Sequence, residues 1–531
     1  MSKYSFKNLF KSIDLTKGTP WKVILVFWVP IVLSYLFQQS YTLIDELICG
    51  HYLADSYVTG IDDTNSLVFL ILQFAFGCTA GFSVISGGKK GENDIDGLRK
   101  SFVTQTFLAL IVSIILTIIA VLLVPFLLNA LSLNETNNYE TYHAAKIFIT
   151  TIYAGLFTQI FYNLICSFLR SIGDSLTPFL FLAGSTFLSI GLDFLFIAAM
   201  PQYLPDFGLK GANGVFGAAL SVDISQFLAA FACYIYAIKK YPYLKPKKED
   251  FKFSWNFCYE HLKLGLPMAF QFSILAIGLI VLQNNVVSFD NFSKNYYLTY
   301  NKPFHYFGVD FSPIYDSTSQ LSFNLAQTSF GPSSKFEVFL EVTLDALGAS
   351  MLSFCSQNRG ARNYKRIKIG IKQSFIISSI ICTIIALIEL LASINGGVLY
   401  LFLHKDYVTD AVKVYTNMWF YCIAPATYIL GILFIVRSSI QGLGKSFFPL
   451  CSGILELVAR VLVCLFLPAI INPNFILNSP HYGWAYLSVC LAHPFAWILA
   501  IIPPSIALYF YVFKNKLEID DFKKYGDGKI L

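Results

Sequence analysis

The chain has 531 residues, of which 56% are apolar and only 13% are charged. A soluble protein of this length needs more surface charge, so most of the surface is expected to face lipid. The net charge of +6 comes from basic residues in short loops between apolar runs, which excludes the basic patch of a nucleic-acid-binding protein.

Apolar runs of about 20 residues predict twelve membrane-spanning helices, six in each half of the chain. The first span of each half contains a proline, Pro30 or Pro267, which can bend the helix. The fold class is therefore expected to be an all-α polytopic membrane protein. The expected spans are 21–48, 66–87, 102–130, 144–169, 178–200, 213–238, 262–286, 335–356, 372–402, 411–436, 448–470 and 483–513.

The distribution of lysine and arginine predicts the orientation of these spans. Most of the 38 basic residues lie in the N-terminal segment and in the segments that share its side of the membrane. Because basic residues accumulate on the cytoplasmic side, we expect both termini of a cell-membrane protein to be cytoplasmic. The outer segments hold Lys146, Lys210, Lys294, Lys302, Lys335, Lys405 and Lys413, and Arg460 lies deep within a span.

The two halves of the chain repeat a short motif. The sequence GDSLTP at 173–178 recurs as GKSFFP at 444–449, and each copy follows an arginine, Arg170 or Arg437, that closes an apolar run. With an even number of spans in each half, the two repeats have the same orientation in the membrane. Parallel repeats related by an axis along the membrane normal are typical of secondary transporters.

The spacing of these landmarks predicts the domain organisation. Residues 1–20 form a cytoplasmic segment, 21–245 an N-lobe, 246–513 a C-lobe and 514–531 a cytoplasmic tail. Matching positions in the two halves place an additional polar segment, 288–334, on the outer face of the C-lobe. This segment either caps the mouth of a cavity or is a tolerated loop insertion.

Two aspartates in the N-lobe are candidates for a cation or proton site. Asp45 lies near the outer end of the first span, and Asp193 lies about 15 residues past Pro178 in a span that also runs outward. Two carboxylates in one partly buried site can hold a proton or bind a cation together. Asp45 has the alternative of reaching the outer interface.

Other charged residues in the spans occur in the C-lobe. Glu456 and Arg460 stand at i and i+4 of one span, which predicts an internal ion pair, with a role in a C-lobe cavity as the alternative. Glu337, Glu341 and Asp345 share one helical face near the outer start of span eight. That face fits a solvated mouth.

Three further residues have no partner visible in the sequence. Asp223 and Glu389 lie within spans, where an ionisable group costs free energy unless it is paired or hydrated. His493 precedes a proline and fits a structural role better than a proton relay.

Several short motifs occur in a fixed order along the chain. They are Pro30, Gln38-Gln39, Tyr41 to Asp45 and Gly50 in the first span, then Leu169 to Ser175 with Pro178, Gly217-Ala-Ala219 with Ser225-Gln226, Gln357 to Ala361, Gln441 to Ser446, and Glu456 to Arg460. This series resembles the multidrug and toxic compound extrusion (MATE) family of secondary transporters, bacterial type. The resemblance covers nearly all of 30–513 except the additional segment.

The resemblance implies export of organic, often cationic, compounds in exchange for H⁺ or Na⁺. Two six-helix lobes would enclose a central cavity and alternate between inward and outward openings. Gln38, Gln39 and Tyr41 are candidate polar residues of that cavity. The implied partners are a small organic substrate and membrane lipid, with no nucleic acid. The implied state is a monomer without a cofactor other than the coupling ion.

The resemblance also implies a coupling site. Asp45 and Asp193 match the carboxylates of the family's N-lobe cation site, and Asn163 corresponds loosely to a polar residue near it. The family usually has asparagine at the position of Ser189 and often threonine at that of Val222. Because Na⁺ is a hard cation that prefers several oxygen ligands, these departures weaken Na⁺ binding at the two aspartates and leave H⁺ at least as good a candidate.

Three other functions remain open. A lipid-linked sugar flippase of a related fold would need a markedly cationic cavity, and few basic residues lie in the spans. A membrane-embedded enzyme would need a convergent cluster of histidine, serine or metal ligands, whereas the seven histidines are scattered. A non-transporting membrane scaffold is the third alternative, because Ser189 and Val222 depart from the family pattern.

Overall fold

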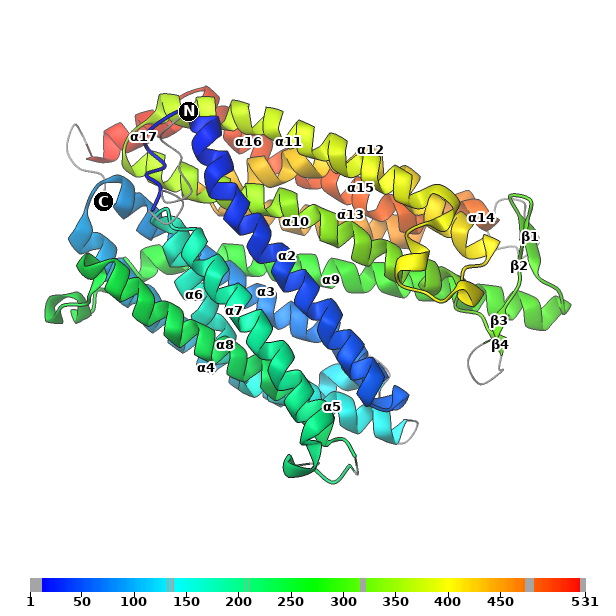
Figure 1. Cartoon of the computed structure of the whole chain (residues 1–531). Helices are drawn as coiled ribbons and strands as arrows, with labels where there is room; N and C mark the ends of the chain where they lie inside the picture. Colours follow the sequence, from blue (N-terminus) through cyan, green and yellow to red (C-terminus); the bar gives the residue numbers. More distant parts are fainter. Residues whose placement is uncertain are drawn as a thin grey trace.

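A computed structural model shows a helical protein of twelve membrane spans (Figure 1). Eleven helices are long and apolar enough to cross a bilayer, and a pair bent by 47° forms one more span. The prediction of twelve spans is therefore confirmed. The structure describes residues 12–130, 133, 135, 138–205, 207–209, 211–315, 321–472 and 482–525.

The N-lobe contains the first six spans. Its fourth span is the bent pair, which breaks at Gly155, and its fifth ends in a turn of π-helix, η1. The helices are α2 (Pro20–Tyr52), α3 (Asp55–Gly91), α4 (Ile95–Ala130), α5 (Tyr139–Ala154), α6 (Leu156–Ser171), α7 (Leu176–Asp193) with η1 (Phe194–Ala199), and α8 (Asn213–Lys240). Short 3₁₀ turns η2 (Pro201–Tyr203), η3 (Pro242–Leu244) and η4 (Lys248–Phe251) lie in the connections.

The C-lobe contains the other six spans. Its last span is built from consecutive helical pieces, with prolines inside α15 and at the start of α16. The helices are α9 (Trp255–Tyr300), α10 (Leu325–Gly360), α11 (Tyr364–Ser393), α12 (Asp410–Gly442), α13 (Phe447–Ile471), α14 (Tyr482–Ala485), α15 (Leu487–Ala500), α16 (Ile502–Leu508) with η9 (Tyr509–Phe513), and α17 (Lys516–Tyr525). The turns η5 (Ile394–Gly396), η6 (Leu399–Leu401) and η7 (Lys405–Tyr407) join α11 to α12.

The additional segment 288–334 is largely folded. Helix α9 has 46 residues and continues through the start of this segment to Tyr300. Two antiparallel hairpins follow, one of β1 (Phe304–Tyr306) with β2 (Val309–Phe311) and one of β3 (Ile314–Tyr315) with β4 (Leu321–Ser322). Helix α10 then begins at Leu325, where the Asp290 carboxylate accepts hydrogen bonds from the backbone N–H groups of Ala326 at 2.7 Å and Gln327 at 3.0 Å. A carboxylate on the free N–H groups of a first helical turn stabilises the start of that helix.

The two lobes meet through backbone contacts at the end of the molecule that carries both termini, called here the termini end (Figure 1). A Cβ atom on Gly360 of α10 would lie 2.1 Å from the carbonyl oxygen of Gly88 in α3. A Cβ atom on Gly91 would lie 1.9 Å from the carbonyl oxygen of Gln357. Figure 1 shows the lobes diverging toward the opposite end, where the hairpins lie, called here the hairpin end. The structure is therefore closed at the termini end.

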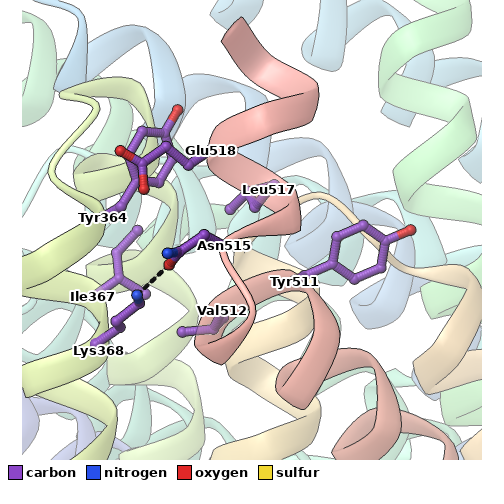
Figure 2. A pocket seen from close by; sticks show the side chains of 8 residues that line it. All are labelled: Tyr364, Ile367, Lys368, Tyr511, Val512, Asn515, Leu517 and Glu518. Atoms are coloured by element: carbon purple, nitrogen blue, oxygen red, sulfur yellow. Dashed lines mark hydrogen bonds between the residues drawn. The ribbon is translucent and has the colours of Figure 1, made fainter. Parts of the chain in front are cut away.

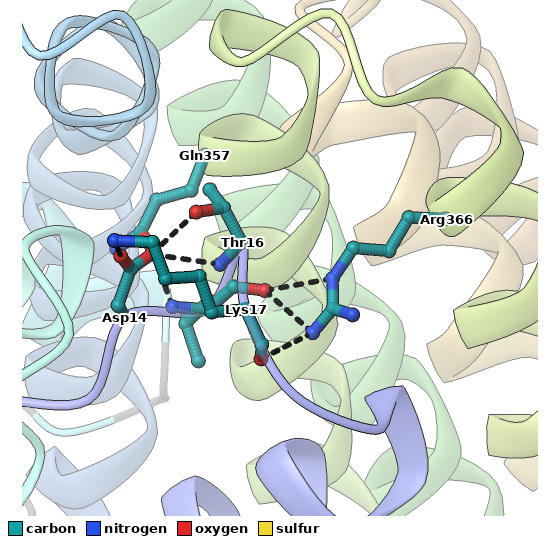
Figure 3. Close-up of polar contacts among 6 residues, drawn as sticks. Asp14, Thr16, Lys17, Gln357 and Arg366 are labelled. Atoms are coloured by element: carbon teal, nitrogen blue, oxygen red, sulfur yellow. Dashed lines mark hydrogen bonds and ion pairs between the residues drawn. The ribbon is translucent and has the colours of Figure 1, made fainter.

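A segment before α2, residues 12–19, crosses this closed contact and is called here the N-terminal strap (Figure 3). The N–H of Ile13 donates to the carbonyl of Gly173 in the N-lobe at 2.8 Å. Two residues later, the N–H of Leu15 donates to Oε1 of Gln357 in the C-lobe at 3.2 Å. The strap therefore binds both lobes within three residues.

Two further side chains of the C-lobe bind the strap, the guanidinium of Arg366, which Figure 3 shows, and the amide of Asn358. The Arg366 guanidinium donates to the carbonyls of Leu15 at 3.1 Å and Lys17 at 2.7 Å, and Nδ2 of Asn358 donates to the Leu15 carbonyl at 3.1 Å. Hydrogen bonds to a charged donor are stronger than neutral ones. These contacts recognise backbone atoms of the strap and not its side chains.

The C-terminal helix α17 also packs against the termini end. Asp521 accepts from Nη2 of Arg359 at 2.9 Å and from the Tyr364 hydroxyl at 3.1 Å. Beneath this helix lies a hollow of about 10 Å³, which holds no more than a single water molecule and no organic compound. Figure 2 shows the side chains that line it. It is lined by Tyr364, Ile367, Lys368, Tyr511, Val512, Asn515, Leu517 and Glu518.

The predicted orientation gives a direct test by cysteine labelling. In a background where Cys422 and Cys451, the two partly exposed cysteines of the described chain, are serine, Lys302→Cys should react with an impermeant maleimide in intact cells. Lys248→Cys should react only after permeabilisation, because both lysines are exposed but at opposite ends of the molecule. If Lys248→Cys and not Lys302→Cys were labelled in intact cells, the predicted orientation would be wrong. The 473–479 loop, also predicted to face outside, lies outside the described residues.

Candidate functional site

Asp193 is a fully buried carboxylate at the point where α7 passes into the π-helix η1. Its Oδ1 accepts a hydrogen bond from the Ser221 hydroxyl of α8. Its Oδ2 has no hydrogen-bond partner among the described residues. A buried carboxylate that lacks a partner for one oxygen is costly in a membrane if it is ionised. We therefore expect this oxygen to bind a proton or a cation. Turns of π-helix within spans are frequent at functional sites.

Asp45 lies on α2, within electrostatic range of Asp193. It is partly buried, and its Oδ1 is 4.0 Å from the Cys49 thiol. One turn earlier on α2, the Tyr41 hydroxyl is buried and has no hydrogen bond among the described residues. It lies near Ser189. The structure thus brings together four of the residues predicted from sequence. All four lie toward the hairpin end, because α2 and α7 both start at the termini end.

Hydroxyl groups of α8 complete the surroundings of Asp193. The Ser225 hydroxyl donates to the Ser189 hydroxyl at 3.1 Å, one turn along α8 from the Ser221 contact. Between them, Val222 packs against the apolar core of the N-lobe and supplies no oxygen. Sequence reasoning missed Ser221, although its i, i+4 spacing to Ser225 places both hydroxyls on one face of the span.

The remaining sequence candidates lie apart from this pair of carboxylates. Nδ2 of Asn163 donates to the Gln159 carbonyl of its own helix at 2.8 Å, and none of its hydrogen bonds within the described ranges reaches Asp45 or Asp193. Gln38 is exposed and Gln39 half-buried on α2. These two glutamines lie on the same helix as Tyr41, closer to its start.

Asp223 is a third buried carboxylate of the N-lobe, for which the sequence offered no partner. It lies against the break between α5 and α6, where a Cβ atom on Gly155 would be 2.0 Å from Oδ2. Its Oδ1 is buried without a hydrogen bond in the part of the chain that the structure describes. The absence of a side chain at Gly155 therefore makes room for this carboxylate at the bend.

A three-residue ion network lies in the C-lobe. Glu456 Oε1 is 3.2 Å from Arg460 Nη2, as its i, i+4 spacing predicts, and Glu456 Oε2 is 2.6 Å from Arg437 Nη2. All three residues are buried. Sequence reasoning assigned Arg437 only to the end of its span. Its counterpart Arg170 in the N-lobe binds the Tyr35 hydroxyl at 3.3 Å.

A cavity of about 570 Å³ opens between α9 and α13, toward the hairpin end of the C-lobe. This volume is in the range of sites for small organic molecules. Its lining mixes apolar side chains with two amides. It is formed by Val281, Asn284, Asn285, Ser288, Phe289, Phe292, Cys464, Leu465 and Pro468.

Comparison with known proteins identifies the family. The MatE family model matches residues 30–195 and 328–466, together more than half of the chain, which therefore belongs to the MATE family. This confirms the resemblance found in the sequence, and it places the chain among membrane transporters and not among enzymes.

Individual relatives agree with this assignment. The chain is 27% identical over 282 residues to the probable multidrug resistance protein YpnP of Bacillus subtilis, an alignment that covers 52% of this chain and 59% of that protein. It is 24% identical over 380 residues to YoeA of the same species, covering 70% of this chain and 72% of YoeA. The chain thus spans less than two thirds of the length of the first of these relatives.

Solved structures share the fold. One is described as the outward-facing conformation of a multidrug resistance MATE family transporter of the MOP superfamily, with a TM-score of 0.75 and 18% identity over 95% of this chain and 99% of that one. A crystal structure of MATE in the bent conformation gives a TM-score of 0.74 at 18% identity, with the same coverage.

Proposed function

We propose that this protein exports small organic, often cationic, compounds across the cell membrane in exchange for a cation, with Asp193 and Asp45 as the coupling site. The observation that carries this proposal is the fully buried Asp193, whose Oδ2 lacks a partner in the described chain. Membership of a transporter family and the names of the relatives, probable multidrug resistance proteins, support the direction and the substrate class. We expect a monomer with both termini in the cytoplasm.

The coupling ion of this proposal is H⁺. A Na⁺ ion prefers several oxygen ligands, whereas Val222 supplies none and the Asn163 amide bonds to its own helix. A proton needs only one free carboxylate oxygen, and Asp193 has one. Protonation removes the cost of a buried charge, so a protonated N-lobe is stable in a dry arrangement that the ionised form disfavours.

Alternating access follows from the arrangement of the two lobes. The contact at the termini end is closed by glycines, while Asp45 and Asp193 lie toward the end where the lobes diverge. On the predicted orientation, this conformation lets protons reach the carboxylates from outside. Opening of the termini end would then admit a substrate from the cytoplasm and release the protons there.

The arginines near the spans do not favour the alternative of a lipid-linked sugar flippase. Such a substrate carries a diphosphate and needs free cationic groups in the cavity. Arg437 and Arg460 both bind Glu456, and Arg170 binds Tyr35. Glu456 therefore binds two of these three arginines, and the remaining one, Arg170, does not by itself make a markedly cationic cavity.

Transport assays in proteoliposomes test both the function and the ion. We expect efflux of a cationic dye driven by a pH gradient, with little change when Na⁺ replaces K⁺. The double variant Ser189→Asn with Val222→Thr should increase sensitivity to Na⁺, because it replaces the Ser189 hydroxyl by an amide carbonyl and adds a hydroxyl oxygen at position 222. Strict dependence of transport on Na⁺ in the unmodified protein would exclude H⁺ as the coupling ion. The proposal of cation-coupled antiport would still stand. Absence of gradient-driven transport with any cation would contradict the proposed function.

A further inference from the structure

The segment that joins the two lobes, residues 241–254 between α8 and α9, is called here the interlobe linker. It lies at the termini end (Figure 1), and its turns η3 and η4 pack against α4 of the N-lobe. Leu244 is buried in the apolar core that includes Phe102 of α4. Asp250 is buried as well, and its carboxylate binds the guanidinium of Arg99 in α4. The linker is therefore a folded part of the N-lobe surface.

Four large aromatic side chains of the linker and of the first turns of α9 are exposed, and they are called here the aromatic patch. They are Phe251 at 66%, Phe253 at 55%, Trp255 at 76% and Tyr259 at 64% exposure. The ring of Phe253 packs edge-to-face on Trp255, with 4.9 Å between centroids, and on Phe107 of α4, with 6.1 Å. Phe107 is exposed near the inner end of the predicted span 102–130, in the most apolar of the spans that the structure describes. The aromatic patch is therefore continuous with a surface that faces lipid.

Four exposed lysines lie in the same stretch of chain as the aromatic patch. They are Lys245, Lys247, Lys248 and Lys252. The neighbouring ion pairs use Arg99 and Lys240, and none of the four lysines forms an ion pair among the described residues. Against them the linker exposes one acid, Glu249. The linker therefore carries an excess of positive charge that the protein itself does not neutralise.

This combination matches the chemistry of a membrane surface with negative charge. Aromatic rings concentrate at the boundary between acyl chains and headgroups, and lysine side chains lie along apolar surface while their ammonium groups extend toward polar groups. The cytoplasmic leaflet contains anionic lipids that attract lysines close to it, and the predicted orientation places the termini end on this side. Exposed apolar patches of this kind mark interaction surfaces. Continuity with the lipid-facing surface of α4 favours a lipid over a protein as the partner.

We propose that the interlobe linker and the first turns of α9 bind anionic phospholipids of the cytoplasmic leaflet. The four rings of the aromatic patch lie at the level of the headgroups, and the four lysines bind phosphate oxygens of the lipids beside them. Because Asp250 and Arg99 fix the linker to α4, the bound lipid belongs to the N-lobe and anchors the junction of the two lobes at the membrane surface. Lipid binding depends neither on the transported compound nor on the coupling ion.

Quenching of tryptophan fluorescence by brominated lipids tests this contact. Bromine on the acyl chains close to the headgroup quenches a tryptophan that touches the lipid, and the part that belongs to Trp255 is the quenching that Trp255→Phe removes. The full-length protein is placed in nanodiscs of equal parts phosphatidylglycerol and phosphatidylcholine, with one of the two lipids brominated. We expect Trp255 to touch phosphatidylglycerol about five times as often as phosphatidylcholine, as for one lysine at an anionic surface. Trp484, an exposed tryptophan at the hairpin end, is the matched control and should show no such preference by the same subtraction.

Removal of the lysine charges separates the contribution of charge from that of the rings. In a fourfold variant that replaces each lysine with glutamine, Trp255 should remain quenched, but the two lipids should quench it equally. The variant should keep the thermal stability of the unmodified protein, because the four side chains are exposed. Inorganic phosphate added at constant ionic strength should leave the lipid preference unchanged, because the ligand is a lipid. The replacements are Lys245→Gln, Lys247→Gln, Lys248→Gln and Lys252→Gln.

Four results would overturn the proposal. Absence of Trp255 quenching by either lipid would place the aromatic patch in water. Equal quenching by both lipids in the unmodified protein would show rings at the interface without selection of a lipid. A preference that survives in the fourfold variant would assign the selection to other residues. Loss of the preference in inorganic phosphate would show that the lysines bind a soluble anion.

Discussion

Replacing Asp193 with asparagine should reduce gradient-driven export to the background level while leaving the protein folded and inserted. The amide is nearly the same size as the carboxylate, and its Oδ1 can still accept from Ser221. It cannot gain or lose a proton, so the free energy of a cation gradient can no longer be coupled to the movement of the lobes. Asp45→Asn should act in the same direction. Dye efflux in proteoliposomes, alongside the thermal stability of the purified variant, measures both parts of this expectation.

An exposed aspartate on a neighbouring helix provides the matched control for this experiment. Asp55→Asn changes the same functional group at the exposed start of α3 and should leave export intact. If the Asp193→Asn and Asp45→Asn variants both continue to transport against a gradient, the coupling site is not at these two aspartates.

The substitution Gly360→Ala should destabilise the conformation that is closed at the termini end, and export should fall strongly. The new Cβ atom would lie 2.1 Å from the carbonyl oxygen of Gly88. Both sides of this contact are helix backbone, so no side chain can move aside. Overpacking of this kind typically costs about 1–3 kcal/mol, which shifts a conformational equilibrium by about tenfold, since 1.4 kcal/mol corresponds to a factor of ten.

Thiol accessibility reports this shift. Ser356 is buried at the same contact, so Ser356→Cys should react slowly with a maleimide in the otherwise unmodified protein and about tenfold faster once Gly360→Ala is added. Gly88→Ala is the control, because a Cβ atom on Gly88 meets nothing within 4 Å although its carbonyl is the contacted atom. Equal reactivity in Gly360→Ala and Gly88→Ala would show that this contact does not set the conformation.

The sequence was sufficient for those parts of the molecule that depend on residue type alone. Long apolar runs specify the spans, because no other structure satisfies the backbone in lipid. Asp45 and Asp193 stood out for the same reason, since a carboxylate within a span is rare. The helical spacing of Glu456 and Arg460 likewise predicted the distance between them.

Other contacts left no signal in the sequence because they depend on tertiary packing. Arg437 joins Glu456 from a different helix, and nothing in the spacing of the two residues indicates that their spans pack together. Glu337 was expected at a solvated surface, yet Trp419 and neighbouring aromatic side chains cover it. The N-terminal strap is recognised through its backbone carbonyls, and every residue type carries such a group.

The strap also constrains how the protein is made. Leu15 and its partner Asn358 are separated by 343 residues, and at a synthesis rate of 5–20 residues per second about 17–70 s pass between them. Throughout this interval the strap, residues 12–19, has no C-lobe to bind, and it docks only after α10 and α11 have been inserted. Binding of the strap is therefore a late step of assembly that reports a completed C-lobe. A chain that stops before α10 would leave this segment without its C-lobe partners and therefore open to proteases.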